Sequence, residues 1–235
     1  MPDPDLSATV RLLTWNIHRG YGPDHKCDLA RVVAIVRRHA PDIVALQEVD
    51  SRPAWGSGAA FDVLRQALGP HAAEAKAISA VDGDYGHVLL SRWPLHEVVI
   101  LDLSVARREP RRAIEALVGT EHGPLRLVTA HLGLFPAERR HQGATVASLA
   151  RAAPGPIVMA GDFNDWSRRG SATLALSAEM PGRTEHRTFP ARLPLGRLDR
   201  IYCRPAAALV RSWSDPLARL ASDHLPLIAD IAVTQ

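Results

Sequence analysis

The sequence predicts an α/β protein whose strands form two sheets within one domain. The chain has 235 residues, a length that fits one large α/β domain and leaves little room for a second. Apolar residues make up 46% and charged residues 23%, which is ordinary for a globular protein and excludes a mainly disordered chain. Many short strand patterns beside few long helices favour two sheets over a simple doubly wound parallel sheet. We expect a tail over residues 1–9 and the domain over 10–235.

Strands and helices alternate in the first third of the chain. Residues 10–17 and 42–49 are apolar, β-prone runs that are typical of buried strands. Between them, residues 28–39 carry apolar side chains at helical spacing, with Asp28 as the expected N-cap. A second helix is expected over 59–68, which a Gly-Pro pair ends.

The rest of the chain is a series of strands separated by Pro or Gly turns, with one long helix. Strands are expected over 87–91, 95–103, 112–119, 125–131, 156–162, 198–203, 207–213 and 225–233. The long helix is expected from Pro136 to about Ala153, and a short one within 167–180. Residues 180–196 are rich in Pro, Gly and Arg and predict a mobile loop near a functional site.

The charge and the apolar runs limit the function classes. The net charge of +3 tolerates an anionic substrate but falls short of the basic stripe of a dedicated DNA-binding protein. No apolar run approaches the roughly 20 residues that cross a bilayer, and the N-terminal residues do not resemble a signal peptide. We therefore expect no transmembrane segment, a cytoplasmic location and no obligate protein partner. Cys27 and Cys203 lie far apart and are expected to be unpaired.

Polar side chains recur where apolar strands begin or end. The residues concerned are Asn16, Glu48, His131, Asp162, Asn164, Asp199, Asp223 and His224. A polar group at the mouth of a buried strand costs free energy unless it is paired or solvated. So many separate accidents are improbable, and the pattern predicts that the strand ends converge on one carboxylate-rich cavity.

These residue types suit a hard cation and proton transfer. Glu48, Asp223 and Asn16 can supply the oxygen ligands that Mg²⁺ or Mn²⁺ prefers. A histidine held by a carboxylate transfers protons near neutral pH, and His224 with Asp199 is the natural pair. No Cys/His cluster has the spacing of a structural zinc site. The residues thus predict metal-assisted hydrolysis of a phosphate ester.

The order of the motifs carries a specific resemblance. LTWNIHRG, IVALQEVD, HVLLSRWPL, VTAHLG, AGDFND, LDRIYC and SDHLPLIADI run through residues 10–233. In this order they resemble the endonuclease/exonuclease/phosphatase superfamily. The resemblance implies a four-layer α/β/β/α sandwich of two mixed β-sheets, DNase I-like, with the site at one end of both sheets.

The resemblance also implies roles on the metal side of the site. Glu48 matches the family's principal metal ligand, and Asn16 and Asp223 match the residues that assist it. Asp162 and Asn164 match the pair that orients the attacking water and contacts phosphate or a second metal.

Further roles concern the histidines and one arginine. His224 matches a residue that binds phosphate or acts as a base, steadied by the match of Asp199, and His131 matches the second catalytic histidine. The segment EPRRAIEA looks like small bacterial members, some of which act on phospholipids or sphingomyelin, and in which a match of Arg111 reaches the site. His87 departs from the asparagine that is common at its position. His131 replaces a tyrosine that is usual in the DNA-repair branch, which argues against an abasic-site endonuclease.

The substrate stays open among a lipid headgroup, a nucleic acid and a small molecule. The sequence has no obvious DNA-binding insertion and no hydrophobic hairpin, which favours a small or headgroup-sized phosphate ester, with a phosphodiester first. The alternatives are a nuclease, a small-molecule phosphatase and, outside the enzymes, a non-catalytic binding module with the same fold. His18, His87 and Trp166 lie beside the motifs with roles that stay open; Trp166 could stack on a base, touch a headgroup or pack its own loop.

Overall fold

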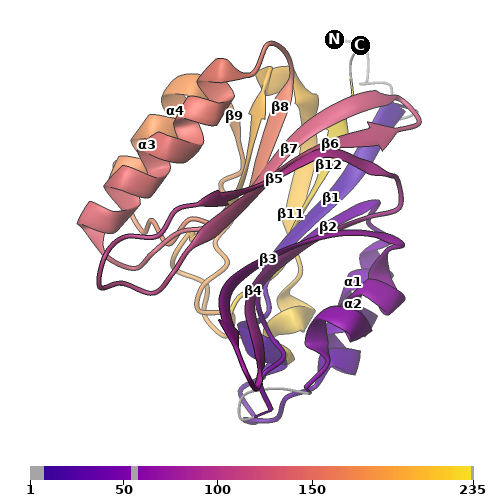
Figure 1. Cartoon of the computed structure of the whole chain (residues 1–235). Helices are drawn as coiled ribbons and strands as arrows, with labels where there is room; N and C mark the ends of the chain where they lie inside the picture. Colours follow the sequence, from indigo (N-terminus) through magenta and orange to yellow (C-terminus); the bar gives the residue numbers. More distant parts are fainter. Residues whose placement is uncertain (1–7, 54–57, 234–235) are drawn as a thin grey trace.

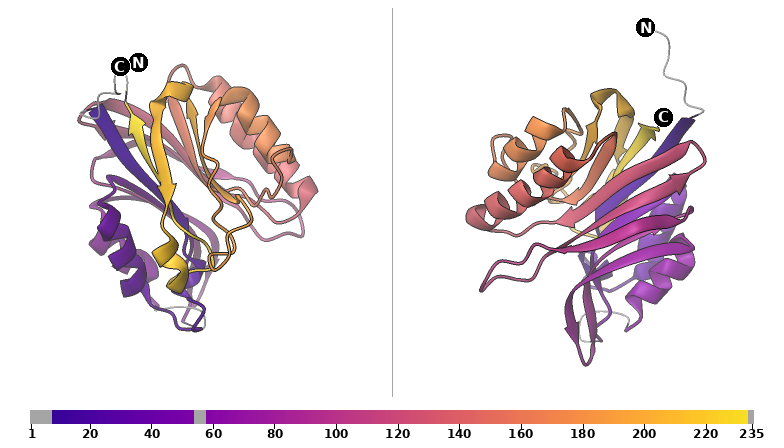
Figure 2. Two further views of the ribbon diagram at one scale, coloured as in Figure 1. Left: turned by 180° about the vertical axis from the view of Figure 1, so that it is seen from behind. Right: turned by 45° about the horizontal axis from the view of Figure 1, so that its top comes forward.

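Two six-stranded sheets pack face to face, and helices cover the outer face of each (Figure 1). The structure is a computed structural model that describes residues 8–53 and 58–233. Seen from behind, α1 and α2 lie on one side of the paired sheets while α3 and α4 lie on the other (Figure 2). The predicted four-layer α/β/β/α sandwich is therefore confirmed.

The first sheet combines both ends of the chain. Its order is β11-β12-β1-β2-β4-β3, formed by β1 (Thr9–Asn16), β2 (Ile43–Asp50), β3 (His71–Ala80), β4 (Gly83–Ser91), β11 (Leu209–Ser214) and β12 (Leu227–Ala232). Helices α1 (Leu29–His39) and α2 (Ala60–Leu68) cover it. Asp28 caps α1 as predicted, since its side chain accepts a hydrogen bond from the Arg31 backbone N–H.

The middle of the chain forms the second sheet. Its order is β5-β6-β7-β8-β10-β9, formed by β5 (Leu95–Asp102), β6 (Arg112–Thr120), β7 (Gly123–His131), β8 (Ile157–Asp162), β9 (Gly182–Arg183) and β10 (Asp199–Arg204). Helices α3 (Pro136–Ala152) and α4 (Ser171–Glu179) cover it. The short 3₁₀ helices η2 (His18–Gly20), η3 (Ala206–Ala208) and η4 (Pro216–Leu220) lie in connections.

Three apolar layers hold the sandwich together. The middle layer joins the inner faces of the two sheets, for example Leu12 and Ile43 with Leu127. A second layer packs the first sheet against α1 and α2, and a third packs the second sheet against α3 and α4. Because burial of apolar area is the main favourable term in folding, these layers fix how the strand ends of the two sheets face each other.

Each sheet has one parallel pair near its centre, and both pairs end at the same edge of the sandwich. In the first sheet β1 and β2 are parallel and finish at Asn16 opposite Gln47. In the second sheet β7 and β8 are parallel and finish at His131 opposite Asp162. The antiparallel neighbours β12 and β10 begin at this edge, which explains how strand starts and strand ends gather there.

Two strands were not predicted from the sequence, the long β3 and the two-residue β9. β3 comes from HAAEAKAISA, where Ala, Glu and Lys disfavour a strand, yet it pairs with β4 along its whole length. The expected strand 87–91 is only the second half of β4. The segment expected as a loop over 180–196 holds the short β9 and an isolated bridge between Phe189 and Gly196.

Two further expectations concern cysteines and membranes. Cys27 and Cys203 are free thiols, as predicted. Among the described residues, no helix combines the length and the apolar character that a membrane crossing requires.

Gly161 is required just before the site residue Asp162, and its replacement by alanine tests this. Its φ is +147°, and an added Cβ would lie 1.9 Å from the carbonyl oxygen of Ala130 on the parallel neighbour. Gly161→Ala should therefore lower the free energy of unfolding by about 3 kcal/mol, measured by urea denaturation. Gly155→Ala is the matched control, because a Cβ there meets nothing within 4 Å. Equal stability of the two variants would contradict this account.

Candidate functional site

All nine residues that the sequence nominated gather at the edge where the two parallel pairs end. Eight of them line one pocket of about 290 Å³: Asn16, Glu48, Arg111, His131, Asp162, Asn164, Asp223 and His224. The ninth, Asp199, lies behind the pocket and is hydrogen-bonded to His224. The sequence pattern thus brings together residues that lie up to 208 positions apart in the chain, as with Asn16 and His224.

A bulge in β2 places Glu48 in the pocket. Between Leu46 and Val49 the strand carries one more residue than its partner β4, so the register shifts. Glu48 takes a left-handed backbone conformation there, with φ 56°. Such backbone costs free energy in a non-glycine residue and is commonly kept where function needs a side chain re-aimed.

Asn16 links the carboxylates of the two sheets. Its side-chain nitrogen donates to Glu48 Oε1 and to Asp162 Oδ2, both at 3.0 Å. Its side-chain oxygen accepts from the backbone N–H of His18 at 3.0 Å. The amide thereby spans the gap between the sheets, and it binds both carboxylates through its nitrogen rather than its oxygen.

Asp162 is the centre of the site. Its Oδ2 lies 3.7 Å from His131 Nε2 and 3.8 Å from His224 Nε2, and its Oδ1 accepts from the backbone N–H of Asn164 at 2.8 Å. Burial, together with the nearby charge of Asp199, raises the pKa of Asp162 above its ordinary value. Asn164 is fixed in turn, since its side-chain nitrogen donates to the Leu132 carbonyl at 2.9 Å.

His224 and Asp199 form the buried pair that the sequence predicted. His224 Nδ1 lies 2.8 Å from Asp199 Oδ2, and both side chains are almost fully buried. Burial alone would lower the pKa of His224, but the charges of Asp199 and Asp162 outweigh it and raise the value to about 10. The pair therefore holds a proton on an imidazole that faces Asp162 and the pocket.

His131 has the opposite electrostatic setting. Burial, followed by the positive charge of Arg111 and the neighbouring histidines, lowers the pKa of His131 well below its ordinary value. Arg111 Nη1 lies 3.2 Å from His131 Nδ1 and 2.7 Å from Glu109 Oε1. The environments of the two histidines that flank Asp162 thus shift their pKa values in opposite directions.

His87 lies behind this histidine. It is buried, and burial with the charge of Arg111 lowers the pKa of His87 to about 4, so its ring is neutral at ordinary pH. His87, Arg111 and His131 line one very small cavity of about 10 Å³. His87, the departure from the family pattern noted in the sequence, is therefore buried beside His131 and does not line the pocket of about 290 Å³.

The donor set fits a divalent cation. Glu48 and Asp223 face the same pocket; Glu48 accepts from the Asn16 amide, and Asp223 lies 3.6 Å from the His18 imidazole. Neither contact is with a permanent cation, so oxygen atoms of both carboxylates are available to a metal. A second group, Asp162, Asp199 and His224, has ligand atoms within 4.8 Å of one another. Its His224 and Asp199 already bond to each other, so we regard Glu48 and Asp223 as the better metal ligands.

Several pocket residues gave no signal in the sequence. They are Arg19, Tyr85, Glu109, Leu134, Phe189 and Leu198, and Trp166 also reaches the pocket. Phe189 packs on His224, with ring centroids 4.7 Å apart, and Trp166 packs edge-on against Phe189. Most of these side chains come from loops between helices and strands, and the hydrophobic periodicity of a sequence does not predict where a loop lies. Only the position of 180–196 near the site was predictable.

Comparisons with known proteins agree with this geometry. The model of the endonuclease/exonuclease/phosphatase family matches residues 13–224. The chain is 32% identical over 260 residues to "Uncharacterized protein YbhP" of Escherichia coli strain K12, covering 98% of this chain and 99% of that one. Among solved structures, an endonuclease/exonuclease/phosphatase from Beutenbergia cavernae DSM 12333 is similar with a TM-score of 0.76 and 22% identity, covering 96% of this chain and 72% of that one. The mannosyl-6-phosphatase Bt3783 of Bacteroides thetaiotaomicron VPI-5482 is similar with a TM-score of 0.69 and 16% identity, covering 95% and 100%. The chain belongs to the endonuclease/exonuclease/phosphatase family.

Proposed function

We propose that the protein is a divalent-metal-dependent hydrolase of a phosphate ester, with a phosphodiester as the favoured substrate. One observation carries the proposal: His131 and His224 flank Asp162, with their Nε2 atoms 3.7 and 3.8 Å from Asp162 Oδ2, in a pocket that also holds Glu48 and Asp223. Groups whose environments drive their pKa values apart are typical of acid–base sites. The family match supports the same class of chemistry.

The chain's own residues divide the work. Glu48 and Asp223 would hold Mg²⁺ or Mn²⁺, which supplies neutralisation of charge on the phosphoryl and leaving oxygens. The carboxylate of Asp162 accepts the proton of the attacking water, while Asn164 and Asn16 keep that carboxylate in place.

The histidines and Arg111 complete the site. His224 is held as a cation by Asp199 and stabilises the negative phosphoryl oxygens. Arg111 lines the same pocket, and burial together with its charge lowers the pKa of His131; the Nε2 of His131 faces Asp162, so that His131 contacts the phosphate or the leaving oxygen. Each role stays a prediction that substitution can test.

A turnover screen tests the proposal. Four substrates separate the classes: bis-p-nitrophenyl phosphate, p-nitrophenyl phosphate, plasmid DNA and sphingomyelin, each with Mg²⁺, with Mn²⁺ and with a chelator. We expect release of nitrophenolate from the diester that the chelator abolishes and added Mg²⁺ restores. The chelator removes the metal ion that neutralises phosphoryl charge, and the pocket carboxylates alone would repel that charge.

The other outcomes are informative. Cleavage of DNA with a steep decline in added salt would indicate a nuclease, because many phosphates would then be contacted. Turnover of the monoester alone would indicate a phosphatase. No turnover of any substrate would overturn the proposal, and metal binding measured by calorimetry would then favour a binding module with this fold.

A further inference from the structure

A second, larger pocket adjoins the catalytic pocket. It has a volume of about 630 Å³, against about 290 Å³ for the catalytic one, and Arg19 and Asp223 line both. Pockets of roughly 300–1,000 Å³ are typical of small-molecule sites. The catalytic pocket alone is thus at the lower limit, whereas the two together offer room for a phosphoryl group with two substituents.

The walls of this adjoining pocket are held in place by backbone contacts. On one side, the backbone N–H of Ala191 donates to the Asp223 carbonyl at 2.6 Å, and Ala191 is buried in the core. This hydrogen bond ties one wall of the pocket, which contains Pro190, Arg192 and Leu193, to the segment that carries Asp223.

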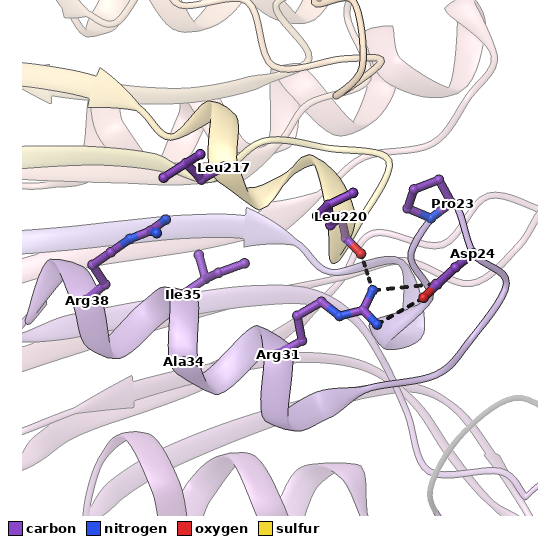
Figure 3. A pocket seen from close by; sticks show the side chains of 8 residues that line it. All are labelled: Pro23, Asp24, Arg31, Ala34, Ile35, Arg38, Leu217 and Leu220. Carbon is purple, nitrogen blue, oxygen red and sulfur yellow. Dashed lines mark hydrogen bonds and ion pairs between the residues drawn. The ribbon is translucent and has the colours of Figure 1, made fainter.

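The opposite wall is clamped by Arg31. This guanidinium donates to Asp24 Oδ2 at 3.0 Å and to the Leu220 carbonyl, and so joins the loop after η2 to η4 (Figure 3). The two segments are in tight contact, since a Cβ on Gly22 would lie 2.1 Å from the Leu220 oxygen. Pro23, which belongs to this loop, lines both the groove of Figure 3 and the adjoining pocket.

The chemistry of the lining indicates the occupant. Proline and leucine side chains supply apolar surface, and Arg19, Arg192 and Arg219 supply positive charge against one carboxylate, Asp223. Arg192 and Arg219 are exposed, and neither pairs with an acidic side chain within residues 8–53 and 58–233. Guanidinium groups beside an apolar wall suit a group with an apolar body and a carboxylate or phosphate.

We propose that the adjoining pocket binds the second substituent of a phosphodiester, and that this substituent is apolar and carries its own negative charge. The inference rests on the proposed function and makes it more specific. A phosphomonoester would leave the pocket empty, and a cationic substituent such as choline would face Arg192 and Arg219 unfavourably.

Three diesters with the same leaving group test this. Each releases 4-nitrophenolate, and the other substituent is phenyl, 4-carboxyphenyl or choline. With Mg²⁺, kcat/KM for the carboxyphenyl diester should exceed that for the phenyl diester by about tenfold, the size expected for charge-assisted hydrogen bonds, with the choline diester below both.

Variants assign the preference to the pocket. In R192A/R219A the ratio of kcat/KM between carboxyphenyl and phenyl diesters should fall to about one, whereas R140A should keep the wild-type ratio, because Arg140 is an exposed arginine on α3 away from the pocket lining. In R192E/R219E the preference should turn towards the choline diester, which a folding defect would not produce. A wild-type enzyme without carboxylate preference, or an unchanged ratio in R192A/R219A, would overturn the proposal.

A binding measurement tests the pocket independently of whether the protein hydrolyses the diesters. If no diester is hydrolysed, the phosphodiester part of the proposed function fails, and calorimetry of the same diesters with Mg²⁺ still tests the pocket. Tighter binding of the carboxyphenyl diester that R192A/R219A loses supports the pocket. Equal affinity for all three overturns it.

Discussion

Glu48→Gln should lower kcat for metal-dependent hydrolysis by about 10³-fold or more, because it removes the negative oxygen that a divalent cation needs most. The backbone bulge that aims residue 48 is unaffected by the change, and glutamine keeps an oxygen acceptor for the Asn16 amide. The thermal midpoint should therefore stay near that of the wild type. Initial rates with bis-p-nitrophenyl phosphate measure the effect, and calorimetry with Mn²⁺ should show weakened binding.

The matched control is Glu121→Gln. Glu121 is an exposed carboxylate at the turn between β6 and β7, away from the pocket, so its loss should leave both rate and metal affinity unchanged. If Glu48→Gln kept wild-type turnover, the assignment of Glu48 as the principal ligand would be wrong. If it lost turnover but bound Mn²⁺ normally, the metal would lie at another group, such as Asp162 with His224.

His224→Gln should lower kcat by about 10³-fold, within the range for loss of a group that stabilises or moves charge in the transition state. Asp199→Asn should have a smaller effect, about 10²-fold, because it removes only the partner. Without the charge and the hydrogen bond of Asp199, only Asp162 and Asp223 oppose the effect of burial, so the pKa of His224 should fall from about 10. The imidazole then loses its proton at a lower pH, which weakens its stabilisation of negative phosphoryl charge.

Initial rates measure the loss of kcat, and NMR titration of the histidine ring protons measures the pKa of His224. His141→Gln on the exposed side of α3 is the control and should match the wild type. An Asp199→Asn protein with an unchanged His224 titration would show that the pair does not set the protonation state. A His224→Gln protein with full activity would remove His224 from the proposed chemistry.

The site was predictable because its residues stand at strand ends. A polar residue that directly follows an apolar run, such as Asp162 after PIVMAG, is marked by the local sequence, and two sheets with parallel centres bring such positions to one edge. The sequence also indicated the His224 and Asp199 pair, now seen at 2.8 Å. These features were predictable because they depend on the local pattern of apolar and polar residues and on the two-sheet topology that the order of the motifs implied.

Other features were beyond the sequence because long-range packing decides them. β3 forms from alanine-rich residues only because β4 offers it a partner along its length. Phe189 reaches His224 because two backbone hydrogen bonds, from Ala191 N–H to the Asp223 carbonyl and from Leu225 N–H to the Thr188 carbonyl, tie its loop to the residues before and after His224. The left-handed conformation of Glu48 likewise depends on the register between β2 and β4, which no single strand encodes.

The return of β11 and β12 to the first sheet has a consequence for how the protein is made. All strands of the second sheet precede β11 in the chain, whereas β1 waits for β12 as its antiparallel neighbour. During synthesis on the ribosome, β1 therefore keeps an unpaired edge at a stage when all strands of the second sheet have already been made. Asp223 and His224 lie shortly before β12, so the nascent chain gains the proposed cation ligand, the imidazole and β12 at nearly the same time. A chain that stops before β12 therefore lacks the antiparallel neighbour of β1, and the proposed hydrolysis at this site requires the segment around His224 as well as the earlier strands.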